Sequence, residues 1–143
     1  MRRFERWGLR LGFVLGALTG VVYGALRYFG QTNGEFGPEP GPWQPFWQHA
    51  HVLAAPVLLF ALGIAVRGHV FGMLNRGVRR GRRTGLVLAG LLAPLAIGGY
   101  AVQVVTGASL RAVLGWSHAV LGVAFVVLYA VHWAKPRSAP GPR

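Results

Sequence analysis

The chain has 143 residues, of which 53% are hydrophobic and 13% are charged, and its net charge is +12. Long apolar stretches with few charges are typical of proteins that cross the lipid bilayer several times. The positive charge does not indicate nucleic-acid binding, because the basic residues lie between apolar runs and no soluble domain presents them. The absence of cysteine excludes disulfides, iron–sulfur clusters, thiolate zinc sites and covalently attached haem.

Four apolar segments, each close to the ~20 residues that a membrane-spanning helix needs, follow one another along the chain. The predicted spans are residues 9–29, 49–71, 84–105 and 110–133. The first connection is rich in proline and glycine and predicts an extended loop, the second is strongly basic, and the third is a tight turn. The pattern predicts an all-α protein, a four-helix membrane bundle that forms one domain over residues 1–143 with a short cytoplasmic tail at 135–143.

Arginine and lysine are distributed unevenly between the two sides of the predicted bundle. Thirteen of the 15 lie in the N-terminal segment, the second connection, its flanks and the tail, whereas Arg27 and Arg111 lie on the other side. The positive-inside rule then places both termini in the cytoplasm, as expected for a multi-pass protein of the bacterial inner membrane. A secretory signal is the alternative for residues 1–30, but the long apolar core and the lack of a small-residue cleavage site argue against cleavage.

Histidines mark both ends of the second and fourth spans. His51 and His69 are 18 residues apart, which is five α-helical turns, so they share one face at about 27 Å along the axis. His118 and His132 are 14 residues apart, about 21 Å along the axis and about 40° around it. Because these two spans run in the same direction, we expect His51 and His118 near the outer face of the membrane and His69 and His132 near the inner face.

Ionisable residues within membrane spans are usually functional, whereas a single histidine at the interface can simply sit among headgroups and water. Four histidines that pair at two depths favour a ligand role. His49 competes with His51 for the outer position, but it lies 20 residues from His69 and so about 160° away around the helix. We favour His51, and the choice between His49 and His51 stays open from the sequence.

The chemistry of these pairs favours haem over other metals. Two imidazoles without a carboxylate or thiolate do not complete a tetrahedral zinc site, but they do complete the two axial positions of a haem iron. A helix bundle is a suitable host for this largely apolar cofactor. Because covalent attachment needs cysteine, haem b is the expected form, with two haems per chain.

Paired histidines on the second and fourth spans of a four-helix bundle resemble the di-haem membrane cytochromes b. This family includes the cytochrome b of quinol–cytochrome c oxidoreductases and the small cytochrome b subunits of respiratory enzymes. The resemblance covers about residues 9–134, and its specific part is the histidine pattern. The spacing of 14 between His118 and His132 matches the family, whereas the spacing of 18 between His51 and His69 departs from it. Helix tilt and a bend at Pro56 could absorb the difference.

The resemblance implies transmembrane electron transfer in a respiratory chain. The chain would be an electron-transfer subunit of an oxidoreductase complex, with no catalytic domain of its own. It would exchange electrons with a quinone pool and with a redox partner such as a periplasmic c-type cytochrome or another oxidoreductase subunit. Tyr100 and Gln103 in the third span are weak candidates for binding a quinone, since helix–helix hydrogen bonding explains them at least as well.

The first span carries a ladder of glycines at four-residue spacing: Gly12, Gly16, Gly20 and Gly24. One interpretation is close helix packing of the small-xxx-small kind. The other follows from the resemblance, in which glycines on the first and third spans leave room for the porphyrin, with Gly16 and Gly20 as the candidates here. The two interpretations are compatible.

Haem propionates need cations at the matching depth. Arg27 and Arg111 are the only basic residues on the outer side, while Arg67 and Lys135 flank the inner histidines. Each of these side chains can alternatively extend its charge to the membrane interface. We expect Arg27, Arg111 and Arg67 to contribute to cofactor binding.

Two other functions remain open from the sequence. A histidine-based proton relay or transporter predicts histidines near the bilayer centre and broken helices there, whereas these histidines lie toward the edges. A cofactor-free membrane anchor or assembly subunit predicts that the histidines bind nothing.

Overall fold

The computed structural model describes residues 3–77 and 81–134, and the chain forms two compact units, Met1–Asn75 and Arg76–Arg143. Four helices are long and apolar enough to cross a membrane, which confirms a mostly helical, multi-pass architecture. The predicted tail at 135–143, with Lys135, lies outside the described residues. Whether the two units make one domain stays a prediction.

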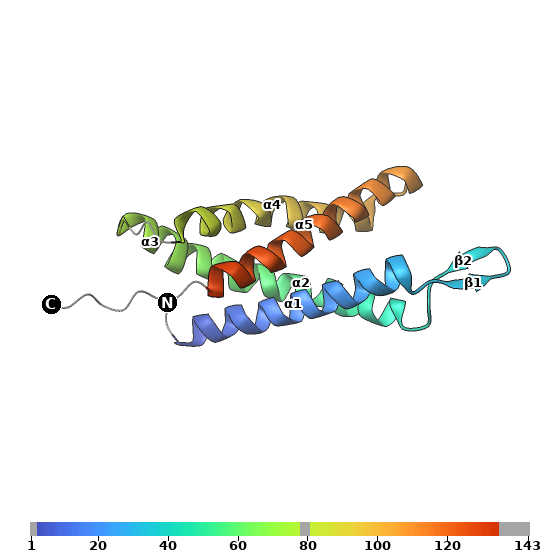
Figure 1. Ribbon diagram of the computed structural model, residues 1–143, viewed down its shortest axis with the longest axis horizontal. Coiled ribbons are helices and arrows are strands. Elements are labelled where there is room, and N and C mark those ends of the chain that lie inside the picture. Colours follow the sequence, from blue (N-terminus) through green and yellow to red (C-terminus); the bar gives the residue numbers. More distant parts are fainter. Residues whose placement is uncertain (1–2, 78–80, 135–143) are drawn as a thin grey trace. The chain divides into compact units, whose positions relative to one another are not determined.

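The first unit is an antiparallel pair of long helices (Figure 1). Helix α1 spans Arg3–Phe29, and α2 spans Gln44–Ala65 with a proline in its first turn, where the missing N–H has no helical partner to lose. Helix α2 continues as a π-helical segment, η1, at Val66–Phe71, and then as the short helix α3 at Gly72–Asn75. The first two spans are therefore longer than the apolar runs that predicted them.

Small residues let α1 and α2 approach closely. A Cβ placed on Gly12 would lie 3.3 Å from the Cα of Leu58, and one on Gly16 would lie 2.8 Å from Leu58 Cδ2. Alanines Ala54 and Ala61 are buried on the α2 side. Van der Waals contact between small residues is the usual basis of helix association in lipid, so this contact explains why the pair forms.

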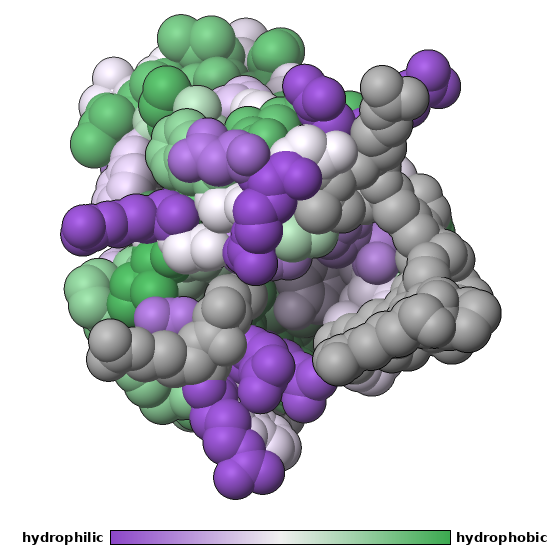
Figure 2. Space-filling view, turned by 90° about the vertical axis from the view of Figure 1, so that its left-hand side faces the viewer, coloured by the Kyte–Doolittle hydropathy of each residue, from purple (hydrophilic) through white to green (hydrophobic). Residues whose placement is uncertain are grey.

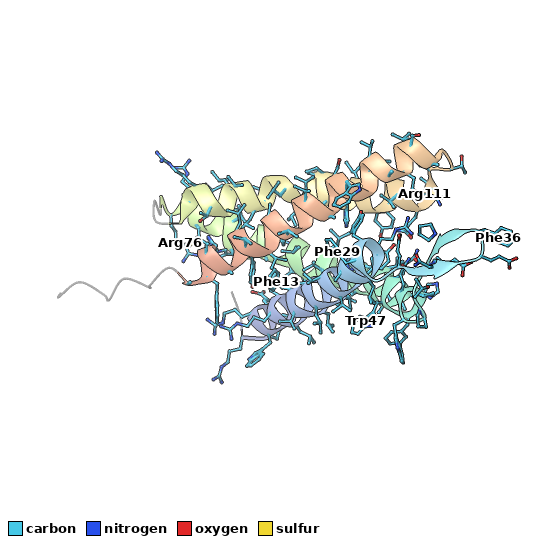
Figure 3. The ribbon with its side chains drawn as sticks, turned by 45° about the vertical axis from the view of Figure 1, so that its right-hand side comes forward. Phe13, Phe29, Phe36, Trp47, Arg76 and Arg111 are labelled. Carbon is cyan, nitrogen blue, oxygen red and sulfur yellow. The ribbon has the colours of Figure 1, made fainter. Side chains whose placement is uncertain are left out.

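Part of the first connection, expected as an extended loop, folds into a two-stranded hairpin. Strand β1 (Thr32–Gly34) pairs antiparallel with β2 (Gly37–Glu39), and Gly37 enters the second strand with φ +119°, which favours glycine. Phe36 lies at the tip, 93% exposed and away from α1 and α2 (Figure 3). The all-α prediction therefore holds for the spans but not for this connection.

The second unit consists of α4 (Arg82–Val104) and α5 (Ala108–Ala134), again antiparallel and joined by a tight turn as predicted. Gly81 precedes α4 in the left-handed region at φ +71°, which ends the basic connection. Helix α4 runs through Pro94 without interruption, and the buried large apolar residues described in this unit are Leu88 of α4 and Phe125 of α5.

The surfaces of both units suit a bilayer. Large apolar side chains are exposed along every long helix, as expected for residues that face lipid rather than a protein core. Hydrophilic side chains gather on the end at which α1 begins, with apolar ones around its rim (Figure 2). This separation of polar end and apolar flank is the pattern that a membrane-spanning helix pair requires.

Candidate functional site

His51 lies near the start of α2 and packs against the later part of α1. Its Nδ1 is 3.1 Å from Thr19 Oγ1, and a Cβ on Gly20 would lie 2.8 Å from its Cε1. The Tyr23 ring lies on the same side, with its centroid 6.4 Å from that of the imidazole. Because α1 and α2 are antiparallel, a residue late in α1 meets one early in α2. Thr19, Gly20 and Tyr23 together fix where this imidazole lies.

His132 has an equivalent environment in the second unit. It lies near the end of α5, and its Nδ1 is 2.9 Å from Thr84 Oγ1 in the first turn of α4. Added Cβ atoms on Gly81 and Gly85 would each lie 3.4 Å from its Cε1, so both glycines are in contact with the ring. A threonine followed by a glycine therefore holds a histidine in each unit.

His118 contacts the middle of α4 through the backbone. Its Nδ1 lies 3.1 Å from the carbonyl oxygen of Leu95. A Cβ on Gly99 would lie 3.0 Å from the Cε1 of His118, closer than a side chain normally allows. His118 and His132 therefore both turn toward α4, as their spacing of 14 residues predicted.

The hydrogen bond of His118 fixes which of its ring nitrogens donates. The Leu95 carbonyl can only accept, so His118 donates from Nδ1. The Thr19 hydroxyl has the carbonyl of Leu15 at 2.7 Å as an acceptor for its single proton, and when it donates there its oxygen accepts from His51 Nδ1. Thr84 has the Gly81 carbonyl at 3.1 Å as the corresponding acceptor in its own helix, and its oxygen then accepts from His132 Nδ1.

In a neutral ring whose Nδ1 donates to such an oxygen, Nε2 carries the lone pair. This is the form in which histidine binds a metal through Nε2 while its other nitrogen is held by a hydrogen bond. The three environments therefore fit a ligand role for His51, His118 and His132.

His69 lies in the π-helical segment η1, which changes its relation to His51. The expected spacing of five whole turns assumed an α-helix throughout, but α-helical geometry ends at Ala65. Because a π-helix bonds i to i+5 and winds more slowly, His69 is rotated from the face that α-helical counting predicts. Gly68 beside it approaches α1, where an added Cβ would lie 3.8 Å from Glu5 Oε2.

His49 and His51 differ in their surroundings. His49 is exposed, whereas His51 is half-buried against α1. Two residues correspond to about 200° of helical rotation, so only one of the two can face α1. The contact with Thr19 and Gly20 favours His51 as the ligand candidate.

The glycine ladder of α1 serves helix packing and the histidine. Gly12 and Gly16 are covered by α2 residues around Leu58, and Gly20 is covered by the His51 ring, so none of the three faces open space. Gly24 has nothing within 4 Å. A four-residue ladder turns by about 40° per step, so it leaves the contact face before its fourth member. The expectation that Gly16 and Gly20 leave space for a porphyrin finds no support in this unit.

The three cation candidates that the structure describes are all exposed. Arg111 uses its Nε to donate to the carbonyl oxygen of Val105 at 2.9 Å, so it also closes the turn between α4 and α5. Arg67 lies in η1, and Arg27 lies in the last turn of α1.

In the third span, the amide of Gln103 donates to the Gly99 carbonyl of its own helix at 3.1 Å. That bond explains Gln103 without a quinone.

Within residues 3–77 and 81–134, no three or more His, Asp or Glu side chains gather into a group that could hold a metal ion. This excludes a protein-only cage there, but a bis-histidine haem needs two ligands. The predicted pairs, His51 with His118 and His69 with His132, each join residues of both units. They stay predictions.

The sequence interpretation missed the partners of the histidines: Thr19, Thr84, the Leu95 carbonyl, Gly85 and Gly99. One signal was present, because a Thr-Gly dipeptide occurs in the helix before each histidine-bearing helix, at residues 19–20 and 84–85. Comparison of the chain with protein-family models, curated proteins and solved structures finds no match. No relative therefore assigns a role to any of these residues.

Proposed function

We propose that this protein carries electrons across a membrane through two haem b groups, each bound between two histidines. His51 and His118 would hold the outer haem, and His69 and His132 the inner one. The observation that carries the proposal is the environment of three of these histidines. The Nδ1 of each ring lies within hydrogen-bond distance of an oxygen on a neighbouring helix, and a neutral ring that donates there keeps its lone pair on Nε2.

This arrangement is more demanding than a histidine at the membrane interface requires. An imidazole among headgroups needs only water, whereas these rings lie so close to glycines that a Cβ added to Gly20, Gly85 or Gly99 would be 2.8–3.4 Å from the ring. Fixed orientation and a held Nδ1 are what a metal-ligating histidine needs, because they set the ring plane and the basicity of Nε2.

Haem, when bound, supplies the one-electron chemistry. The chain's own residues ligate the iron, hold the imidazoles, and surround the site with apolar helices that exclude water. Arg27 and Arg111 on the outer side and Arg67 on the inner side are proposed to balance the propionate charges. Orientation with both termini in the cytoplasm follows from the excess of arginine and lysine on one side.

In the proposed setting, the protein is a subunit of a redox complex in the bacterial inner membrane. It would exchange electrons with the quinone pool on one side and with a partner on the other, such as a periplasmic c-type cytochrome or an oxidoreductase subunit. The chemistry would then be completed by other subunits of that complex.

The relay and anchor alternatives explain fewer of the observations. A relay or transporter predicts helices broken near mid-membrane, but α2 and α4 run through Pro56 and Pro94 without interruption. An anchor gives no reason for three histidines to be held by Nδ1 against glycines.

The test is a reduced-minus-oxidised visible spectrum of the purified protein, with haem quantified per chain by pyridine extraction. We expect two haems b per chain in the unaltered protein. His51→Ala and His118→Ala should each remove the same haem, and His69→Ala and His132→Ala the other. His49→Ala is the matched control and should keep both.

A folded protein from haem-replete cells that contains no haem would refute the proposal and leave the anchor or the relay. One haem per chain would show that one of the two pairs is wrong. Loss of haem in His49→Ala but not in His51→Ala would exchange the roles of those two residues.

A further inference from the structure

The two threonine hydroxyls that hold histidines each also lie beside carbonyl oxygens of their own helix. Thr19 Oγ1 lies 2.7 Å from the Leu15 carbonyl, 3.3 Å from the Gly16 carbonyl and 3.1 Å from His51 Nδ1. Thr84 Oγ1 lies 3.1 Å from the Gly81 carbonyl and 2.9 Å from His132 Nδ1. Each hydroxyl therefore has an acceptor for its single proton within its own helix, and when it donates there its oxygen is oriented as an acceptor for the imidazole.

An acceptor oriented in this way restricts both the tautomer and the rotation of the imidazole. It favours the proton on Nδ1, because in the other neutral tautomer the hydroxyl has to give up its bond to the helix carbonyl in order to donate to Nδ1. It also fixes the rotation of the ring, because the bond is directional and the following glycine, Gly20 or Gly85, lies against Cε1. In an apolar bilayer an unbonded N–H is costly, so no other ring orientation competes well.

We propose that Thr19 and Thr84 are positioning residues that set the orientation and the electron donation of His51 and His132 as haem ligands. This inference rests on the proposed function. It adds that each threonine acts on one haem, Thr19 on the outer and Thr84 on the inner. Nothing comparable applies to His118, whose acceptor is a backbone carbonyl that no side-chain substitution removes.

The hydrogen bond has a predictable effect on the midpoint potential of the haem. A proton shared from Nδ1 makes the imidazole more electron-rich and favours ferric over ferrous iron. Removing the acceptor should therefore raise the potential. If the preference of the ligands for ferric over ferrous iron falls by up to tenfold, the midpoint potential of the haem rises by up to about 59 mV, since the couple transfers one electron.

The experiment is a redox titration of the two haems in the purified full-length protein, followed by visible spectroscopy. Valine matches the shape of threonine without its hydroxyl, and serine keeps the hydroxyl. Thr19→Val should raise the potential of one haem and Thr84→Val that of the other. Thr19→Ser and Thr84→Ser should stay close to the unaltered protein.

The outcomes separate this inference from the proposed function. An unaltered protein without haem refutes the proposed function and the inference with it. Two haems whose potentials respond equally to valine and serine, or not at all, refute the inference alone. If valine variants lose one haem while serine variants keep it, the hydroxyl is needed to hold the ligand and the inference is supported. Loss of helical circular dichroism in the valine variants would instead assign the hydroxyls to helix packing and overturn it.

Discussion

Replacing Gly20 by alanine adds one methyl group where α1 meets the His51 imidazole. The new Cβ would lie 2.8 Å from Cε1 and 3.2 Å from Nδ1 of the ring. Ordinary van der Waals contact begins at 3.4 Å, so the ring has to move by about 0.6 Å, the difference between 3.4 and 2.8 Å. The ring is bonded to Thr19 on the same helix at 3.1 Å, so this movement strains that hydrogen bond as well.

Gly24 provides a matched control one ladder step along α1, because a Cβ placed there meets nothing within 4 Å. Alanine is intrinsically better than glycine inside a helix by about 0.5–1 kcal/mol, and Gly24→Ala should show this gain. Gly20→Ala has the same gain but also overpacks the contact, which typically costs about 1–3 kcal/mol. We therefore expect Gly20→Ala to be less stable than Gly24→Ala by about 1–3 kcal/mol.

The assay is reversible unfolding in detergent micelles followed by far-ultraviolet circular dichroism, with haem quantified on the same samples. Gly20→Ala should unfold first and, under the proposed function, retain less of one haem, whereas Gly24→Ala should retain both. Equal stability of the two variants would refute the close contact of His51 with α1. If Gly20→Ala is less stable but retains both haems fully, the contact of His51 with α1 exists but is not important for haem ligation.

Two other predictions concern packing and topology. Gly12→Ala should destabilise the α1–α2 pair, because the new Cβ would lie 3.3 Å from the backbone Cα of Leu58, whereas Gly8→Ala meets nothing within 4 Å and should not; thermal unfolding of the two variants compares them directly. The chain has no cysteine, so a single introduced cysteine is the only labelling site. A membrane-impermeant maleimide should label Phe36→Cys in intact spheroplasts, but Arg76→Cys only after the membrane is disrupted. The reverse pattern would contradict the proposed orientation.

Hydropathy predicted the four spans because each is an apolar run of bilayer length, and all four exist as helices. It predicted their ends less well. Helix α1 begins at Arg3 and α2 at Gln44, several residues before the apolar runs start. Hydropathy measures how much of a segment suits hydrocarbon, whereas a helix continues into the polar interface as long as its backbone bonds are satisfied.

The π-helical segment and the hairpin could not be predicted in the same way. The sequence VRGHVF does not reveal whether its backbone hydrogen bonds run i→i+5 or i→i+4, because the same residues can form either pattern. The hairpin carries one proline and two glycines within eight residues, a composition that indicates turns without specifying which strands pair. The prediction that His69 shares a helix face with His51 assumed an α-helix throughout, so the π-helical segment weakens it.

The histidine contacts were only partly accessible from the sequence. Helical phase separates His49 from His51, and the structure confirms that the two have different surroundings. The role of Thr19 was hidden, because a threonine within an apolar helix usually bonds its own backbone, and Thr19 does so as well. Its second bond, to a ring 32 residues away, appears only once α1 and α2 are paired.

In both units a threonine on one helix contacts a histidine on the other, but the positions of the two residues along their helices differ. In the first, Thr19 late in α1 meets His51 early in α2, and in the second, Thr84 in the first turn of α4 meets His132 near the end of α5. Each of these two histidines is therefore held by a threonine of the helix pair that carries it. Under the proposed function, each threonine orients one ligand, and the joining of two rings on one iron requires both pairs. Each threonine substitution should then change the haem it serves and leave the other unchanged.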